Sequence, residues 1–236
     1  MPVAVVTGAS RGIGRAIARA LAGDGYELLL VARNKELLED LAKAISSEGG
    51  RAEVCATDLA HEDASERVYE AFTVAYSRLD VLVNNAGIAA SGAFGTYSLE
   101  DWDRVMNINA RAPFFLTQRL LPLLKRADPG FVFNIGSVVS KKGYEQQSLY
   151  VASKHALLGF TKSLARETVN DNVRVHAILP GGVNTELVTG VRPDIDTTEL
   201  ISPDEIAAVV LNWLNMRGNA AIDEISVRRR TKTPWA

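Results

Sequence analysis

The sequence predicts a single α/β domain with a Rossmann-type doubly wound parallel sheet of about seven strands and helices on both faces. Short apolar runs alternate with longer segments of helical periodicity, which is typical of parallel βαβ units. The apolar runs are almost continuously hydrophobic, as expected for strands buried on both faces. The chain of 236 residues suits one large domain, and no linker or repeat interrupts it.

Composition narrows the classes of function. The chain is 47% hydrophobic and 23% charged with a net charge of −2, which gives no electrostatic basis for binding nucleic acid or an anionic membrane. No apolar run approaches the roughly 20 residues of a membrane span. Cys55 is the only cysteine and is expected to be a small buried hydrophobe, and the three histidines lack metal-ligand spacing, so no metal site is expected. The N-terminus shows no signal peptide, and a cytoplasmic protein is expected.

The expected elements alternate along residues 1–236. The predicted strands are Val3–Thr7, Glu27–Ala32, Ala52–Thr57, Val81–Asn84, Phe131–Ile135, Arg174–Leu179 and Ala221–Ser226. The predicted helices are Ile13–Ala22, Lys35–Ser47, Glu62–Ser77, Leu99–Arg126, Leu149–Asn170 and Pro203–Asn215.

The turn between the first strand and first helix is rich in glycine. It reads Thr-Gly-Ala-Ser-Arg-Gly-Ile-Gly and has glycines at 8, 12 and 14. Three residues rather than one separate the first two glycines, which departs from the common dinucleotide fingerprint. Glycines here allow a pyrophosphate to approach the backbone, and the helix N-terminus offers free amides. This turn predicts a phosphate site.

The ends of strands two and three bear on the choice of cofactor. Ala32, Arg33 and Asn34 follow strand two, where an NAD site usually carries a carboxylate. Arg33 and Arg11 are suited to clamp a 2′-phosphate, which favours NADP(H), although both would also fit a solvated surface. Asp58 after strand three either accepts a hydrogen bond from the adenine amino group or is an ordinary turn residue.

A tyrosine and a lysine four residues apart predict the chemistry. Tyr150 and Lys154 lie on a predicted helix and share one face. A nearby ammonium favours the phenolate and allows the tyrosine to exchange protons near neutral pH. Ser137, just after the fifth strand, is placed to hydrogen-bond a substrate carbonyl oxygen. Taken alone, the pair also fits an amphipathic helix with a solvated lysine.

Together with Asn84-Asn-Ala-Gly87, Asn109 and Pro180-Gly181 followed by Thr185, these motifs resemble the short-chain dehydrogenase/reductase family along nearly the whole chain. The resemblance implies that Tyr150 is the acid/base and that Ser137 orients the carbonyl. Lys154 would lower the tyrosine pKa and bind the nicotinamide ribose, and Asn109 would hold a relay water. The resemblance also implies a cofactor site made of Gly8, Ser10, Arg11, Gly12, Ile13, Gly14, Arg33, Asp58, Leu59, Asn85, Ala86, Gly87, Tyr150, Lys154, Pro180, Gly181, Val183 and Thr185.

The expected function is NADPH-dependent reduction of a ketone or aldehyde, with a 3-oxoacyl thioester or another small carbonyl compound as substrate. An NAD-linked alcohol dehydrogenase working oxidatively and a non-catalytic NADP(H)-sensing protein remain alternatives. Loops at the carboxyl ends of the strands should select the substrate: 88–97, 138–147, and a substrate loop around 183–200 with a hinge at Thr189 and Gly190. Phe94, Tyr144 and Leu187 are candidate walls of the substrate pocket.

The expected assembly is a homodimer or homotetramer through the helices at 99–126 and 149–170. Many members of the family end in a glycine pair near the tetramer contact, and in this chain the segment Ile222–Ala236 takes that place. The form of the tetramer contact that is usual for the family is therefore not assumed for this chain. The run Arg228–Arg230 is interpreted as a solvated strand end rather than a polyanion site. Lys141 and Lys142 are interpreted as a solvated turn rather than a site for an acidic partner.

Overall fold

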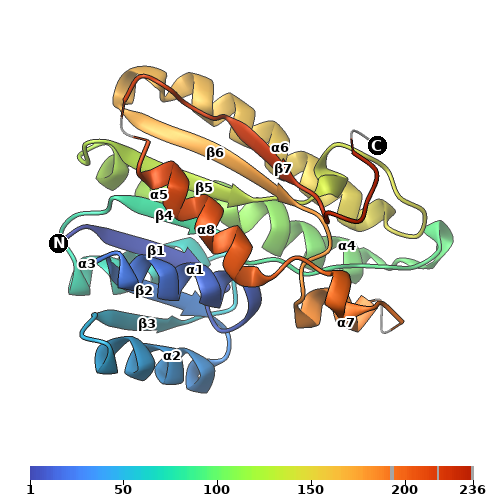
Figure 1. Ribbon diagram of the computed structural model, residues 1–236, viewed down its shortest axis with the longest axis horizontal. Helices are drawn as coiled ribbons and strands as arrows, with labels where there is room; N and C mark the ends of the chain where they lie inside the picture. Colours follow the sequence, from blue (N-terminus) through green and yellow to red (C-terminus); the bar gives the residue numbers. More distant parts are fainter. Residues whose placement is uncertain (192–193, 217, 235–236) are drawn as a thin grey trace.

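Seven parallel strands form one sheet in the part of the chain that the structure describes, residues 1–191, 194–216 and 218–234 of a computed structural model. The spatial order is β3-β2-β1-β4-β5-β6-β7 (Figure 1). The order reverses between β1 and β4, which places the binding crevice at the carboxyl ends of these strands. The strands are β1 (Val3–Thr7), β2 (Glu27–Ala32), β3 (Ala52–Ala56), β4 (Val81–Asn84), β5 (Gly130–Ile135), β6 (Val173–Pro180) and β7 (Glu224–Val227).

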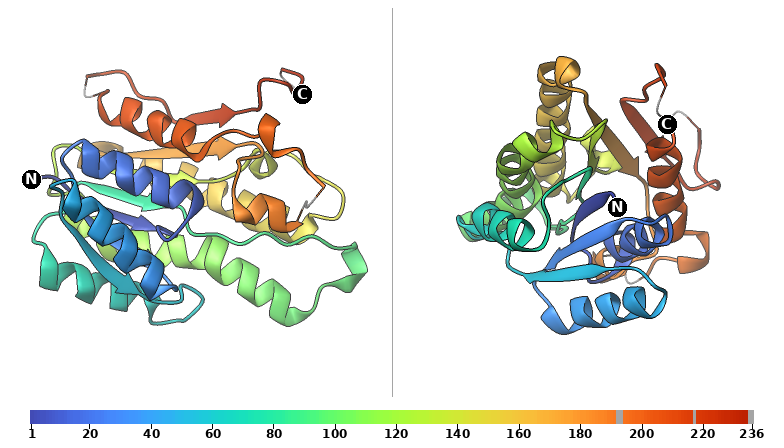
Figure 2. Two further views of the ribbon diagram at one scale, coloured as in Figure 1. Left: turned by 60° about the horizontal axis from the view of Figure 1, so that its bottom comes forward. Right: turned by 90° about the vertical axis from the view of Figure 1, so that its left-hand side faces the viewer.

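Helices cover both faces of the sheet, as Figure 2 shows from two sides. On one face α1 (Gly12–Gly23), α2 (Lys35–Ser47) and α8 (Pro203–Leu214) bury their apolar stripes. On the other face lie α3 (Ala64–Ala75), α5 (Ala112–Leu124) and α6 (Ser148–Glu167). The predicted doubly wound α/β architecture is therefore confirmed.

The predicted helix at 99–126 is helical from Leu99 to Leu124, but it is not a regular α-helix throughout. The chain forms α4 (Leu99–Met106), a π-helical turn (Asn107–Arg111) and then α5. The physical reason lies at Pro113 near the start of α5, because proline has no N–H to donate to the carbonyl four residues before it. The Ala112 N–H accordingly bonds the Asn107 carbonyl, five residues back.

Other departures occur around the carboxyl edge of the sheet. The substrate loop contains a short helix, α7 (Glu186–Val191), and a 3₁₀ turn at Thr197–Glu199. Thr189 and Gly190, where a hinge was predicted, lie inside α7. Pro193, in the middle of the predicted substrate loop, lies outside the described residues. Further 3₁₀ turns occupy Phe94–Thr96, Val138–Ser140 and Val169–Asp171.

None of the helices within the described ranges combines the length and apolar character needed to cross a membrane. The same residues contain no cluster of three or more histidine, cysteine, aspartate or glutamate side chains able to hold a metal ion.

Candidate active site

The structure brings Ser137, Tyr150 and Lys154 together at the carboxyl end of β5. Ser137 follows the strand and caps the turn Val138–Ser140 by accepting a hydrogen bond from the Val139 N–H, 3.3 Å away. Tyr150 lies in the first turn of α6, and its hydroxyl hydrogen-bonds the Ser137 side chain. Lys154 lies one turn later, with its ammonium 5.9 Å from the centre of the Tyr150 ring. A phenol, a hydroxyl and an ammonium thus converge on one point.

Burial sets the protonation of the two titratable groups. It raises the pKa of Tyr150 to about 12, and the hydrogen bond with Ser137 acts in the opposite direction. Burial also lowers the pKa of Lys154 to about 8. The Lys154 ammonium donates to the Ile135 main-chain oxygen at 2.9 Å and has no carboxylate partner among the described residues. The tyrosine is therefore a neutral phenol at neutral pH, and the predicted lowering of its pKa by Lys154 is not found here.

Asn109 lies in the π-helical turn, and both polar atoms of its side chain form hydrogen bonds. Its Oδ1 accepts from the Ile88 N–H at 2.9 Å, and its Nδ2 donates to the Ile88 oxygen at 2.9 Å and to Ser153 Oγ at 3.0 Å. The side chain is 1% exposed. The amide holds the segment after β4 against α6, which is a positioning role that the sequence did not indicate.

Gly87 permits this close assembly. A β-carbon added there would lie 3.3 Å from Asn109 Oδ1 and 3.4 Å from Lys154 Nζ. Those distances are tighter than ordinary packing allows, so a side chain at this position would displace the buried amide or the ammonium. The glycine keeps the segment after β4 in contact with Lys154.

The glycine loop fits a pyrophosphate. Gly8 has φ +66° and Gly12 has φ +54°, a left-handed region that disfavours side chains. Arg11, at the N-cap of α1, makes no side-chain cap, and the first turn contains no acidic residue. The amides of that turn consequently face the crevice without a competing carboxylate, as an anion requires. Ser10 and Ile13 are half-buried in the same loop, and Gly14 packs against the Gly8 carbonyl.

Thr7 fastens the glycine loop to the segment after β4, a role that the sequence analysis missed. Its Oγ1 donates to the Val83 oxygen and accepts from the Asn85 and Ala86 N–H groups, both at 3.0 Å. Asn85 Nδ2 returns a bond to the Thr7 oxygen at 2.9 Å. A buried threonine directly before the first glycine was the available signal.

The two arginines of the predicted phosphate clamp each contact a carboxylate. Arg11 pairs with Glu186 at the start of α7. Arg33 Nη1 lies 3.7 Å from Asp58 Oδ2, and the other Asp58 oxygen accepts from the Ala60 N–H at 3.0 Å. Both pairs are substantially solvent-exposed, so a phosphate can displace either carboxylate at small cost.

The loop after β6 lies against the glycine loop. The Gly181 N–H, next to Pro180, bonds the Val227 oxygen of the neighbouring chain segment at 2.7 Å. Val183 is buried and forms a bridge with Ile201. The Thr185 methyl group lies 3.0 Å from where a β-carbon on Gly12 would be. The structure thus brings the loop after β6, whose residues the resemblance assigns to the cofactor site, against the predicted pyrophosphate loop.

A buried hydrogen-bonded chain supports the site from below. Asn84 Nδ2 donates to Thr117 Oγ1 at 2.9 Å and to Asn134 Oδ1 at 2.8 Å, and Asn134 Nδ2 donates to Thr161 Oγ1 at 2.8 Å. The four side chains connect α5, β4, β5 and α6. The chain of hydrogen bonds ties α6 to β5, although Asn84 Oδ1 is buried without a hydrogen-bond partner among the described residues.

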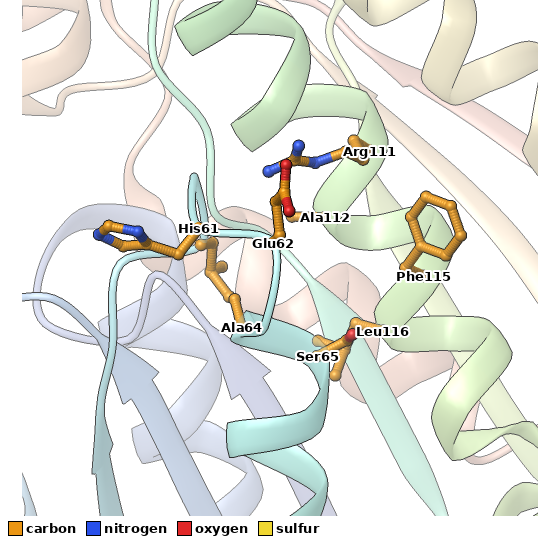
Figure 3. Close-up of a pocket in the computed structure, with 9 residues that line it drawn as sticks. His61, Glu62, Ala64, Ser65, Arg111, Ala112, Phe115 and Leu116 are labelled. Carbon is orange, nitrogen blue, oxygen red and sulfur yellow. The ribbon is translucent and has the colours of Figure 1, made fainter.

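Two of the predicted substrate segments touch each other. The Gly92 N–H and the Tyr97 hydroxyl both donate to the Gln146 carbonyl, at 2.8 and 3.1 Å. Phe94, Tyr144 and Leu187 are exposed beside the crevice. A cavity of about 300 Å³ lies elsewhere, between the start of α3 and α5 beside Leu59, and Figure 3 shows the side chains around it. None of Ser137, Tyr150 and Lys154 lines that cavity.

A sequence model described as short chain dehydrogenase matches residues 2–196. The chain belongs to the short-chain dehydrogenase family. This confirms the resemblance inferred from the motifs and the expectation of an oxidoreductase.

Individual members of the short-chain dehydrogenase family show the same likeness. The chain is 36% identical to the acetoacetyl-CoA reductase of an Acinetobacter species over 228 residues, which are 92% of this chain and 91% of that protein. Among solved structures, it is similar to an alcohol dehydrogenase from the archaeon Thermococcus sibiricus complexed with 5-hydroxy-NADP, with a TM-score of 0.91, 31% identity and 99% coverage of both chains. It is also similar to a metagenomic short-chain oxidoreductase in complex with NADP, with a TM-score of 0.83, 37% identity and 96% coverage of both.

Proposed function

We propose that this protein reduces a ketone or aldehyde to an alcohol with NADPH, using Ser137, Tyr150, Lys154 and Asn109. The observation that carries the proposal is the convergence of a neutral phenol, a hydroxyl and a buried ammonium at the carboxyl end of β5. Each of these groups suits one part of carbonyl reduction.

Side chains of the protein supply the proton for the reaction. Ser137 and Tyr150 are placed to hydrogen-bond a carbonyl oxygen, where negative charge develops, and Tyr150 then transfers its proton to that oxygen. Because the pKa of Tyr150 is raised to about 12, the phenol carries its proton throughout the neutral range.

The cofactor supplies the hydride when it is bound. The first turn of α1 and the glycine loop would hold its pyrophosphate, and Arg11 with Arg33 would hold the 2′-phosphate that distinguishes NADPH from NADH. Lys154 would bind the nicotinamide ribose, because its buried ammonium has a single main-chain partner and further donors to offer. Solved relatives with NADP, including the metagenomic oxidoreductase, support this assignment.

For the substrate we propose a 3-oxoacyl thioester or another small carbonyl compound. The acetoacetyl-CoA reductase among the relatives supports this choice. Exposed side chains beside the crevice indicate an open pocket, which suits an extended substrate.

We also propose assembly into a homodimer or homotetramer through α4, α5 and α6. Phe114 is 46% exposed and Phe115 is 49% exposed on α5, and Phe114 packs edge-on against Phe160 of α6, with ring centres 5.6 Å apart. Trp102 and Leu99 of α4 are also exposed. A clustered aromatic surface of this kind is typical of a contact between subunits.

The test is NADPH consumption against a panel of carbonyl compounds: an acetoacetyl thioester, a diketone, an aromatic aldehyde and a keto sugar. We expect turnover of at least one class, and we expect Tyr150→Phe to abolish it while NADPH affinity stays within about twofold, since removal of the hydroxyl deletes the proton donor only. Substantial turnover by Tyr150→Phe would show that another group donates the proton. Tight NADPH binding without turnover of any compound would favour the sensing protein.

A further inference from the structure

The basic segment Arg228–Lys232 folds against the loop that follows β6. The chain leaves β7 at Val227, whose oxygen accepts from the Gly181 N–H. A β-carbon on Gly181 would lie 3.7 Å from the Arg228 α-carbon and 3.8 Å from the Arg229 nitrogen. In Figures 1 and 2 this segment lies at the carboxyl edge of the sheet, on the same side as α7. The basic segment therefore borders the crevice.

Arg228 organises this segment into a closed turn. One of its guanidinium nitrogens donates to the main-chain oxygens of Arg229, Arg230 and Lys232, at 3.1, 3.1 and 2.9 Å. The Lys232 N–H bonds the Arg229 oxygen at 3.0 Å. Thr231 Oγ1 lies 3.4 Å from Glu199 Oε2, which connects the turn to the end of the substrate loop. These hydrogen bonds hold the turn in a defined conformation at the edge of the site.

The side chain of Arg229 points from this turn toward the loop that follows β6. Its side chain is half-buried over Gly182: a β-carbon there would lie 3.7 Å from Arg229 Nε and 3.8 Å from Arg229 Cδ. Within the described residues its guanidinium makes no ion pair. Arg230 and Lys232 are exposed beside it, and no acidic residue follows Glu224 in the chain. The turn thus places four cations within five residues at this rim, with Glu199 as a carboxylate that contacts it.

Lys141, which the sequence analysis considered as a site for an acidic partner, is already paired with a carboxylate of the protein. Lys141 Nζ lies 2.7 Å from Glu224 Oε1, and Lys162 Nζ lies 3.8 Å from the other Glu224 oxygen. Among the described residues Arg229 has no such carboxylate partner, and a planar guanidinium binds a carboxylate or phosphate through two parallel hydrogen bonds.

We propose that Arg229 binds an anionic group, a carboxylate or a phosphate, carried by the substrate at a distance from its reacting carbonyl. This inference rests on the proposed reductase function and narrows its substrate to anionic carbonyl compounds. Gly182 lies within the loop Pro180–Thr185 that follows β6, whose residues the family resemblance assigns to the cofactor site, so the Arg229 guanidinium lies beside that site.

The first experiment compares keto acids with their methyl esters. The substrates are 3-oxobutanoate, 4-oxopentanoate and 5-oxohexanoate, each with its ester, and the enzymes are wild type, Arg229→Gln, Arg229→Lys and the control Lys43→Gln. We expect wild type to prefer at least one acid over its ester by about 10- to 100-fold in kcat/KM. Arg229→Gln should remove this preference by raising the KM for the acid, and it should leave the rates with the esters unchanged. Arg229→Lys should restore part of it, and Lys43→Gln, on the exposed surface of α2, should retain it.

The phosphate ester of 4-hydroxybutan-2-one enters the same assay, and a larger dependence of its kcat/KM on Arg229 would identify phosphate as the preferred anion. An acid-to-ester ratio that Arg229→Gln leaves unchanged, for every keto acid and for the phosphate, would overturn the proposal. Equal losses on acids and esters would overturn it as well, because they indicate structural damage.

The second experiment separates this proposal from the reductase function. Hexanoate is titrated into the protein with NADP⁺ by calorimetry, and we expect Arg229→Gln to weaken its binding about 10-fold, with Lys43→Gln as control. Arg229-dependent binding without turnover of any ketone would remove the reductase function and retain the anion site. Turnover of the esters, with hexanoate binding that does not depend on Arg229, would retain the reductase and remove the anion site.

Discussion

The Lys154 ammonium donates to the Ile135 main-chain oxygen at 2.9 Å and lies 3% exposed between β5 and α6. Its burial lowers the pKa of Lys154 to about 8. A charged lysine with one neutral acceptor in the protein interior opposes folding, because desolvation of the ammonium exceeds what a single hydrogen bond returns. The fold tolerates this charge where the cofactor is expected to bind.

Replacing Lys154 with methionine should therefore stabilise the protein and destroy its activity. Below pH 8 the lysine is charged in both the folded and the unfolded chain, and the folded state bears the full cost of burial. Between pH 8 and 10.5 the unfolded chain binds more protons, so the wild-type free energy of unfolding rises with pH and the advantage of Lys154→Met shrinks. We expect a gain on the order of 2 kcal/mol at pH 7, measured by urea unfolding across this range. Lys162→Met, on the exposed face of the same helix, should show no such trend.

The titration of Lys154 should also change the pH dependence of NADPH binding. The value of kcat/KM for NADPH reports the free enzyme, and it should fall above pH 8 as Lys154 loses the charge that is proposed to bind the nicotinamide ribose. Tyr150 stays protonated in this range because its pKa is raised to about 12. Steady-state assays from pH 7 to 10 at saturating ketone measure the profile. A flat profile over this interval would contradict the proposed role of Lys154.

Asn109→Leu should damage both stability and turnover. The leucine has a similar volume but leaves the Ile88 N–H and Ser153 hydroxyl without the bonds that Asn109 supplies. We expect a loss of about 1–3 kcal/mol in unfolding free energy and a fall in kcat that exceeds any change in the KM for NADPH. Asn107→Ala in the same π-helical turn serves as the control. Unchanged kcat in Asn109→Leu would limit the residue to a structural role.

Arg33→Asp tests the 2′-phosphate assignment. The substitution places a carboxylate where a phosphate is proposed to bind, and Asp58 lies 3.7 Å from the present guanidinium. NADPH binding should weaken by about 100-fold or more, while NADH binding changes little. Fluorescence titration with both cofactors measures the difference, and equal losses for the two would count against Arg33.

Phe114→Glu tests the proposed contact between subunits. A carboxylate in the middle of an aromatic contact surface is costly to bury, so the variant should be a monomer where the wild type is a dimer or tetramer. Sedimentation measures the mass. Val74→Glu, at a position 90% exposed on α3, should retain the wild-type assembly, and a wild-type protein that sediments as a monomer would refute the proposed contact.

Local patterns were sufficient to predict the sheet and the positions that converge on the crevice. Tyr150 and Lys154 were recognisable because a spacing of four places both on one helical face, and Ser137 because it ends an apolar strand. Their pKa values were not predictable, since these depend on how far the tertiary structure removes water from each group. The sequence suggested a phenolate, whereas the folded protein holds a phenol.

Long-range partners were the other part that sequence reasoning missed. Glu186 pairs with Arg11 across 175 positions, and Thr7 fastens a segment 78 residues away. Arg229 was interpreted as a solvated strand end, and only the packing of its side chain over Gly182 distinguishes it from Arg230. Contacts of this range leave no periodicity for a local pattern to reveal.

The π-helical turn at Asn107–Arg111 also sets the phase of one helix relative to the next. A π turn contains one residue more than an α turn, and each residue of an α-helix advances the side chain by about 100°. Deleting one residue there would make the hydrogen bonding more regular and would rotate α4 by that angle relative to α5. Asn109 would lose its aim at Ile88, and the aromatic surfaces of the two helices would no longer face the same way. The irregular turn therefore constrains the length of this segment: an insertion or a deletion there would change the orientation of α4 relative to α5.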